Sequence, residues 1–233
     1  MADARTQNTL IRALSPDGQE LLMRNAKLID LEHGQEFCRP GANIECVFFP
    51  ERGLESLVIM TTEGGVVETG VVGIEGAVGL TEALAEAPFF PTANTQVAGQ
   101  AWKVPVNDCR TVFAQGSARM LVERYAQFLL AEARQSVACQ AFHQLDRRLA
   151  RWIWECHQRS GVGNELPLTH EFMSTMLGSR RASVTETLPK LVPAGIKTVR
   201  GKVIVDDPEA LANYACECRG YIQKLRDELF PVV

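Results

Sequence analysis

The stretch from residue 168 to 206 constrains the fold more than any other part of the chain. Apolar residues recur every three or four positions over 169–177, which predicts a short helix. A Gly178-Ser179 turn leads into a second predicted helix over 180–191. Beyond it, residues 196–205 alternate in polarity, as expected for a β-hairpin. Two short helices joined by a tight turn and followed by a hairpin predict a winged helix-turn-helix.

The distribution of charge indicates a nucleic-acid partner for this half, although the whole chain carries a net charge of −4. Residues 143–205 contain ten Lys and Arg but five Asp and Glu, so this span carries +5 and the rest −9. Such asymmetry suggests that one half meets phosphate while the other does not. Polar and basic residues gather at the start of the second predicted helix, which a major groove is wide enough to admit.

The N-terminal half predicts a small antiparallel barrel or jelly roll. After a short predicted helix over 1–24, brief apolar runs from residue 26 to 105 alternate with Gly-rich turns. Short strands at close spacing with such turns are typical of these folds. We therefore expect an α+β fold: an N-terminal antiparallel β-roll, a long dimerisation helix and a C-terminal winged helix-turn-helix.

Three further helices are predicted. Residues 107–144 contain no proline, and Asn107-Asp108 offers an N-cap. A second helix should cover 146–159, and Asp207-Pro208 should open a closing helix over 208–229. The predicted domain boundaries are 1–106 for the β-roll, 107–144 for the long helix and 145–233 for the domain with the winged helix-turn-helix.

The long predicted helix carries a narrow stripe of apolar residues that becomes rich in alanine. A second copy of the helix packing closely would need such a stripe, and the alternative is that it only covers the barrel. More than thirty residues would span roughly 45–50 Å, which is longer than a small barrel needs. We interpret the stripe as a homodimer contact made by Val122, Ala126, Leu129 or Leu130, Ala133, Val137 and Ala141.

The cysteines indicate a reducing compartment. There are seven, an odd number, and no apolar run approaches the ~20 residues of a membrane span. The N-terminus lacks the basic and apolar segments of a secretion signal. We expect a cytoplasmic protein with reduced, packed thiols, a redox role being the alternative. Cys216-Glu217-Cys218 is too short a spacing for one half of an ordinary zinc site, so no metal site is predicted.

Several fragments, taken in order, resemble the Crp–Fnr family of bacterial transcription regulators over nearly the whole chain. They are His33-Gly34, Pro40-Gly41, the run from Gly70 to Gly79, the run from Cys139 to Trp152, Leu177-Gly178 and the wing tip Arg200-Gly201-Lys202. The resemblance implies a homodimer with an N-terminal sensory domain and a C-terminal DNA-reading domain. It implies no catalytic residues and no enzyme activity.

The nucleotide clamp of this family is not preserved. Members that bind cyclic nucleotides hold the phosphate with an Arg-Ser pair and the ribose with a Glu after a Gly, where this chain has Pro91-Thr92 and Gly79-Leu80. A buried phosphate without its arginine lacks the bidentate partner that makes such a site strong, so cyclic AMP is not the expected effector. The positions that the resemblance places around a pocket are Gly70, Gly73, Glu75, Gly79, Leu80, Pro91 and Thr92.

No cofactor is predicted either, and the effector is left unidentified. Iron–sulfur members of the family use N-terminal cysteines, and none of the first 37 residues is Cys. A haem needs an axial donor, and no local motif supports His33, Cys38 or Cys46 in that role.

The resemblance also selects the DNA contacts. Arg181 lies where the family often has an arginine, whose guanidinium can bind both acceptors of guanine, and Glu186 could accept from a cytosine amine. Arg180 occupies the usual capping position, so Ser179 is expected to cap instead. We predict base reading by Arg181, Ser183, Thr185 and Glu186, and phosphate contacts by Thr169, Arg180, Lys197, Arg200 and Lys202.

Pro189 lies inside the expected second helix of the motif. A proline there removes the hydrogen bond to the Thr185 carbonyl and clashes with it, at about 3 kcal/mol or more in a regular helix. We therefore expect the helix to kink or end near Leu188.

Two recognition helices related by a twofold axis predict a palindromic operator with half-sites one turn, about 34–36 Å, apart. The expected partners are double-stranded DNA, a second copy of the chain and, for an activator, RNA polymerase, but no membrane. One alternative keeps the DNA-binding domain and treats the roll as a ligand-free dimerisation or interaction module. A remote alternative is a cupin-like metalloenzyme, which needs clustered His ligands, whereas only His33 lies in the roll.

Overall fold

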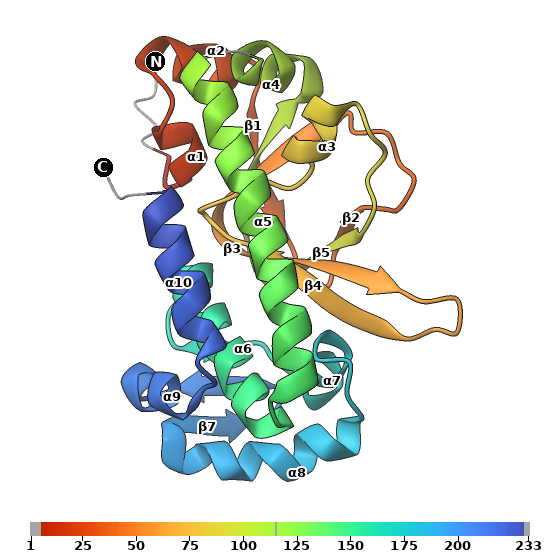
Figure 1. The fold of residues 1–233 in the computed structure, drawn as a ribbon, viewed down its shortest axis with the longest axis vertical. Helices are drawn as coiled ribbons and strands as arrows, with labels where there is room; N and C mark the ends of the chain where they lie inside the picture. The colour runs from red at the N-terminus through yellow and green to blue at the C-terminus, as the bar shows by residue number, and fades with distance from the viewer. Residues whose placement is uncertain (1–5, 115, 231–233) are drawn as a thin grey trace.

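The computed structural model describes residues 6–114 and 116–230. A β-roll lies above a smaller domain that combines helices with a short sheet, and helix α5 (Gly116–Phe142) runs along one side of both (Figure 1). The elements follow the predicted α+β order of roll, long helix and winged helix-turn-helix. No helix among the described residues is long and apolar enough to cross a membrane.

The roll is one antiparallel sheet of five strands. They are β1 (Lys27–Leu31), β2 (Glu36–Cys38), β3 (Cys46–Met60), β4 (Val66–Val72) and β5 (Thr92–Pro105), in the order β1-β5-β3-β4 with β2 also paired to β5. The register between β3 and β5 shifts between Pro50 and Glu55. A Cβ on Gly99 would lie 2.0 Å from the Arg52 carbonyl oxygen, so only glycine allows the two long strands to approach this closely.

Short helices cover the ends of the roll. They are α1 (Thr9–Arg12), α2 (Pro16–Met23), α3 (Leu80–Ala85) and α4 (Val106–Phe113). The described part of the helix predicted over 1–24 is two helices, and α2 has its own start, because the Ser15 hydroxyl caps it and Pro16 is its first residue.

The long helix is shorter than predicted. The predicted helix over 107–144 is interrupted after α4, and α5 begins at Gly116, whose φ of +63° is left-handed. Asn107-Asp108 does not cap α4, which follows directly from the end of β5 with Pro105 at its N-cap position. With 27 residues, α5 spans about 40 Å. Its buried face, which includes Tyr125 and Phe128, packs on the roll.

The C-terminal domain holds the predicted motif. It comprises α6 (Leu145–Ser160), β6 (Glu165–Leu166), α7 (His170–Met176), α8 (Arg181–Leu191), a 3₁₀ turn (Val192–Ala194), β7 (Ile196–Val199) and β8 (Lys202–Val205), with sheet order β6-β8-β7. The helix predicted over 146–159 is confirmed as α6.

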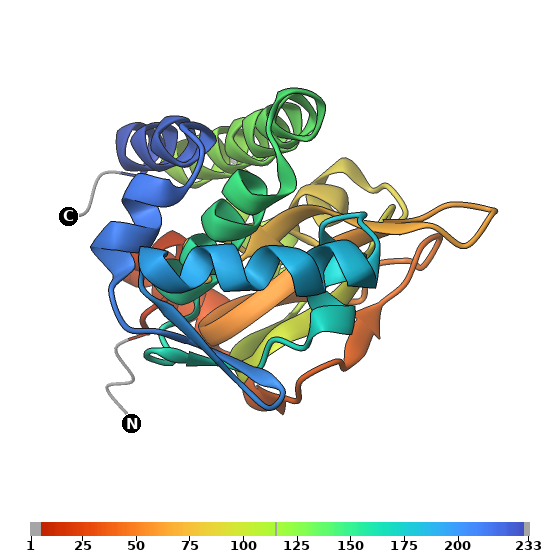
Figure 2. The same cartoon turned by 90° about the horizontal axis from the view of Figure 1, so that it is seen from below.

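The closing helix predicted over 208–229 is instead two helices. Helix α9 (Pro208–Tyr214) ends at Ala215, whose backbone is extended, and α10 (Cys218–Leu229) begins three residues later. Helix α10 then lies beside α5 in Figures 1 and 2. Phe230, directly after it, packs edge-on against Tyr125 and Phe128. The end of the described chain therefore returns to the roll.

One buried apolar cluster joins the two domains. Leu54 and Val58 of β3 pack in the same cluster as Trp152 and Ile153 of α6 and Met173 of α7. The C-terminal domain is therefore seated directly on the roll, and buried contacts set the orientation of α8 relative to α5.

Candidate nucleic-acid interface

The helix-turn-helix is held by a cap, a glycine turn and two side chains from neighbouring helices. The Thr169 hydroxyl accepts from the Phe172 amide, so Thr169 is the N-cap of α7. Gly178 has a left-handed φ of +57°. Arg148 of α6 and Gln140 of α5 donate to the Leu177 carbonyl at 2.8 and 3.3 Å. The turn is thereby fixed to the C-terminal end of α5.

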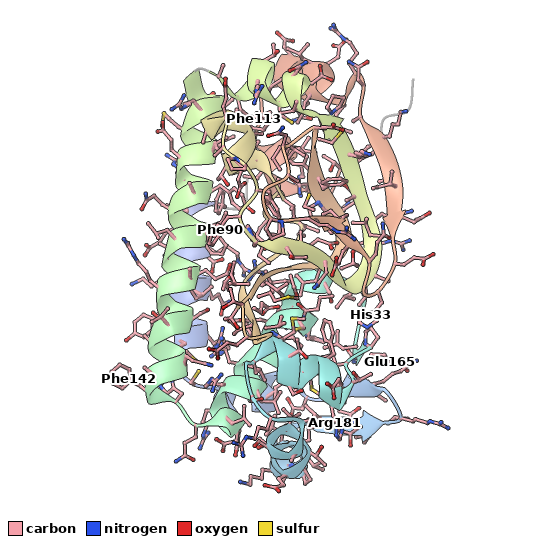
Figure 3. All side chains as sticks on the ribbon, turned by 90° about the vertical axis from the view of Figure 1, so that its right-hand side faces the viewer. His33, Phe90, Phe113, Phe142, Glu165 and Arg181 are labelled. Atoms are coloured by element: carbon pink, nitrogen blue, oxygen red, sulfur yellow. The ribbon has the colours of Figure 1, made fainter. Side chains whose placement is uncertain are left out.

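Helix α8 presents one face to the domain core and another to solvent. Val184, Leu188 and Leu191 are buried, whereas Arg181 and Glu186 are exposed. The exposed face lies at the bottom end of the molecule, and Figure 3 shows Arg181 there. Ser183 is half-buried at the side of the helix.

Helix α8 does not end near Leu188, so that part of the expectation for Pro189 is wrong. The helix continues through Pro189 to Leu191. Leu188 and Leu191 anchor this turn in the core, while Pro189 faces solvent. Burial of the two leucines outweighs the one backbone hydrogen bond that the proline removes.

The expected cap of α8 is also wrong. Arg180 is the N-cap residue, and no side chain bonds to the free amides of the first turn. The Ser179 hydroxyl oxygen is buried and has no hydrogen-bond partner among the described residues. The unsatisfied amides at this end remain able to meet an anion.

Thr185 is already engaged within the motif. Its hydroxyl donates to the Arg181 carbonyl at 3.0 Å and lies 2.9 Å from Nδ1 of His170. His170 thus bridges α7 and α8. Since its hydroxyl proton is used, Thr185 can offer an incoming base its methyl group and the remaining acceptor capacity of its oxygen.

A groove of about 570 Å³ lies between the start of α7, the start of α8 and the wing. Its lining brings together Thr169, Arg181, Arg200 and Lys202, which are separated in sequence. The predicted phosphate contacts Arg180 and Lys197 do not line it.

The cations around this groove differ in their partners. Lys197 pairs with Asp206 at 2.7 Å, Lys202 with Glu165 at 3.0 Å and Arg181 with Glu171 at 3.6 Å. Among the described residues, Arg180 and Arg200 have no carboxylate within 4.0 Å, so their charges are uncompensated.

The apolar stripe on α5 divides between two faces. Val122 is buried against the roll and Leu129 packs with it, so these two residues belong to the chain's own core and not to the exposed stripe. Leu130 is 42% exposed and Val137 71% exposed. Ala141 is exposed as well, and Ala126 and Ala133 are half-buried. Phe142, 85% exposed, projects from the same helix away from the body of the molecule in Figure 3.

The residues predicted to surround a ligand are not gathered around one cavity. Gly79 and Leu80 begin α3, where Gly79 contacts Ile44, and Pro91 is buried ahead of Thr92 at the start of β5. Glu75 is bound to Arg159, beside Gly73. Of the seven predicted positions, Gly70 alone lines a cavity between β4, α5, α6 and α7.

That cavity, of about 430 Å³, lies between β4, α5, α6 and α7. Its walls include Glu68, Arg151 and Trp152, together with Ala133, Val137 and Ala141 of the stripe. Burial raises the pKa of Glu68 to about 7. Glu68 accepts from the Trp152 indole at 2.7 Å and lies 2.7 Å from the Ser56 hydroxyl. The cavity therefore combines apolar walls with convergent polar groups at the junction of all three parts of the chain.

A buried ion cluster beside this cavity was not predicted from the sequence. Arg159 of α6 pairs with Glu75, and its Nη1 lies 2.5 Å from Glu132 of α5. It also donates to the Val71 carbonyl at 2.7 Å. Burial alone would raise the pKa of both carboxyls; contact with Arg159 brings the pKa of Glu75 below its usual value, whereas that of Glu132 stays above it. The separation of 84 residues between Glu75 and Arg159 leaves no local signal.

His33 is a packing residue. Its Nδ1 lies 2.7 Å from the Gln96 carbonyl oxygen, and its ring contacts Phe172 with centroids 5.2 Å apart. It thereby joins the roll to α7.

The fold and the exposed helix define a winged helix-turn-helix protein with a β-roll. A family model for the Crp-like helix-turn-helix domain matches residues 147–214. No curated protein sequence matches the chain. Residues 147–214 are thus a Crp-like helix-turn-helix domain, which is a DNA-binding module.

Solved structures share the whole fold. A Crp/FNR-family regulator from Eubacterium rectale is 20% identical, with 88% of this chain and 96% of that chain covered and a TM-score of 0.63. FixK2 from Bradyrhizobium japonicum is 13% identical, covering 82% and 98%, with a TM-score of 0.67. A Crp/FNR-family regulator from Thermus thermophilus is 22% identical, covering 81% and 98%, with a TM-score of 0.63. The chain thus has the fold of Crp/FNR-family regulators.

Proposed function

We propose that the protein is a cytoplasmic, homodimeric transcription regulator that reads a palindromic operator. The observation that carries this proposal is that one chain exposes two surfaces, an apolar stripe on α5 and the outer face of α8. Leu130 and Val137 on the stripe are large apolar side chains that are exposed to solvent when the chain is alone. Burying them against a second α5 would place two copies of α8 on one side of the dimer.

Within each half-site the exposed end of α8 would enter the major groove. Arg181 and Glu186 are exposed there and can meet base edges, Arg181 by exchanging its exposed ion pair with Glu171 for DNA, and Ser183 and Thr185 lie beside them. Arg180 and Arg200 would be the strongest phosphate contacts, because no carboxylate of residues 6–114 or 116–230 pairs with either of them. Thr169, Lys197 and Lys202 would add contacts that position the domain without reading sequence.

The cavity between the roll, α5 and the C-terminal domain supports a signal-responsive regulator over a ligand-free roll. Its volume of about 430 Å³ lies within the range of small-molecule sites. A ligand there would touch the roll, the dimerisation helix and α7 at once. We therefore assign sensing to residues 1–106, dimerisation to 107–144 and DNA binding to 145–233, with RNA polymerase as a further partner if the protein activates transcription.

Selection of bound sequences from a random DNA pool tests this proposal. The full chain is used without added ligand at a stated salt concentration, because affinity for DNA depends steeply on salt. We expect enrichment of a palindrome with half-sites one helical turn apart. An enriched sequence without twofold symmetry would contradict the dimeric reading mode. If no sequence is enriched in the presence or absence of cell-extracted small molecules, the assignment of α8 as the reading helix is wrong.

A further inference from the structure

Three cysteines and one histidine meet where the dimerisation helix ends. Cys139 and His143 come from the end of α5, and Cys216 and Cys218 from the connection between α9 and α10. One potential ligand atom from each of the four residues lies within 4.8 Å of all the others. The three thiols are buried, and His143 is half-buried.

Two of the six distances between the ligand atoms are close to those of a coordination tetrahedron. The Cys139 and Cys216 sulfurs are 3.5 Å apart, and Cys218 Sγ lies 3.5 Å from Nδ1 of His143. Zinc bonds of about 2.3 Å to sulfur and about 2.0–2.1 Å to nitrogen place tetrahedral ligands about 3.8 Å apart for two sulfurs and about 3.5 Å apart for sulfur and nitrogen. The four side chains therefore need little rearrangement to share one ion.

The groups around the cluster orient it as a metal site requires. Nε2 of His143 lies 3.0 Å from a carboxylate oxygen of Glu217, which would hold the ring with Nδ1 facing the sulfurs. Gln135 donates to Cys218 Sγ at 3.0 Å. The guanidinium of Arg151 lies close enough to Cys139 for its charge to act on the thiol. Two elements of the usual outer shell, a carboxylate on the histidine and a cation near the thiolates, are thus present.

The chain reaches this arrangement from two distant segments. Residues four apart lie on one face of a helix, which brings Cys139 and His143 together at the last turn of α5. The break between α9 and α10 turns both thiols of Cys216-Glu217-Cys218 towards them, and the Cys216 amide bonds to the Arg147 carbonyl at 3.4 Å. The short Cys-x-Cys spacing is therefore only half of the ligand set.

We propose that Cys139, His143, Cys216 and Cys218 form a tetrahedral binding site for one zinc ion per chain. Three thiolates and an imidazole are the ligand set that selects zinc among the common divalent ions. The ion would join the end of α5 and the adjoining His143 to the α9–α10 connection. These ligands lie beside the short link, residues 143–144, between α5 and α6. The ion thereby fixes the C-terminal domain relative to the dimerisation helix.

The test is metal binding by the purified full chain, prepared with a thiol reductant and without chelator. We expect about one zinc per chain by elemental analysis, and a tetrahedral cobalt–thiolate absorption spectrum after exchange with Co²⁺. Cys139→Ser and Cys218→Ser should lose the stoichiometric zinc. Glu217→Gln, at an exposed position, should keep the fold and weaken zinc affinity 10–100-fold. Cys46→Ser, a half-buried thiol of the roll, is the matched control and should bind zinc as the unchanged chain does.

Three results would overturn the proposal. The first is a folded protein that binds neither zinc nor cobalt while all seven thiols react with a thiol reagent. The second is a metal-free protein in which mass spectrometry finds a Cys139–Cys216 disulfide under these reducing conditions. The third is stoichiometric zinc that the cluster variants retain. Glu217→Gln leaves every ligand in place. Its zinc affinity therefore tests the proposed site even if a cysteine variant fails to fold.

Discussion

At the scale of single residues, Arg159 is the cation of a buried ion cluster, and its loss would destabilise the fold. It is buried with Glu75 and Glu132, and so ties α6 to the roll and to α5. Arg159→Ala leaves two carboxylates buried without their cation, and we expect it to lower the free energy of unfolding by about 3–5 kcal/mol. Arg119→Ala breaks an exposed pair with Glu123 and should change it by less than about 1 kcal/mol. Denaturant unfolding of both variants measures this; equal effects would contradict the role of the buried cluster.

In the proposed reading mode, Arg181 makes the contact on which sequence specificity depends most. Arg181→Ala should cost about 1–3 kcal/mol on the selected operator and relax specificity at one base pair per half-site, because a bidentate contact to guanine is lost. Affinity for random DNA should change little. Fluorescence anisotropy with both duplexes gives the comparison.

Arg200→Ala is the contrasting variant at the wing. Arg200 has no carboxylate partner among the described residues, so its loss should weaken all sequences alike and reduce the slope of log affinity against log salt by about 1. If Arg181→Ala showed this uniform pattern instead, the assignment of base reading to Arg181 would be wrong.

At the scale of elements, the contact between β4 and α6 depends on a proton. The Ser56 hydroxyl lies 2.7 Å from both Glu68 Oε2 and Gln96 Oε1, but it has one proton to donate. A protonated Glu68 can donate to Ser56 while its other oxygen accepts from Trp152. Burial raises the pKa of Glu68 from its usual 4.5 to about 7, which favours this arrangement.

The direction in which stability changes with pH depends on whether the folded or the unfolded chain holds the Glu68 proton. Below pH 4.5 Glu68 is protonated in both states, and between about 4.5 and about 7 only the folded chain keeps the proton. Stability should therefore fall as pH rises through this window, by up to about 3 kcal/mol from Glu68, and level off above it. Glu55, whose pKa burial raises to about 8, adds a fall of the same sign.

Glu68→Gln tests this account because the amide mimics the protonated acid. The variant should remove the Glu68 part of the slope between pH 4.5 and 7, and the double variant with Glu55→Gln should remove the rest. Unfolding in denaturant at several pH values measures both. An unchanged slope in the double variant would show that other groups set the pH dependence.

Element order could be predicted from the sequence, but the ends of elements could not. Periodicity and turn residues marked the strands, α6 and the helix-turn-helix. Gly116 and Pro189 show why boundaries failed. Gly116 adopts a left-handed φ and divides the predicted helix, whereas Pro189 lies within α8 because Leu188 and Leu191 are buried. Both outcomes depend on tertiary packing that no local pattern contains.

The parts of the candidate site that lie close together in the sequence could be predicted. The cap at Thr169 and the exposed Arg181 and Glu186 lie within one motif. The large cavity, the Arg159 cluster and the four sulfur and imidazole ligands each join segments that are far apart in the sequence. Their chemistry depends on how the C-terminal domain sits on the roll, which spacing along the chain does not reveal.

At the scale of the whole molecule, the account requires that α5 joins two copies. Leu130→Glu with Val137→Glu would place carboxylates along the twofold seam, where like charges and lost apolar burial both oppose association. We expect a monomer by sedimentation, with the fold retained because both side chains are exposed in one chain. Met60→Glu changes an equally exposed apolar residue at the tip of the β3–β4 hairpin and should leave the dimer intact. A dimeric double variant would require a different interface.

Changing the distance between operator half-sites tests twofold reading most directly. Binding of the full chain is measured on duplexes in which the spacer is lengthened one base pair at a time. A rigid dimer should bind best with half-site centres about 10–10.5 base pairs apart, and adding about 5 base pairs should reduce the affinity to that of a single half-site, because the second major groove then faces away. Equal affinity at every spacing would contradict the account, since it would mean that each chain reads DNA alone.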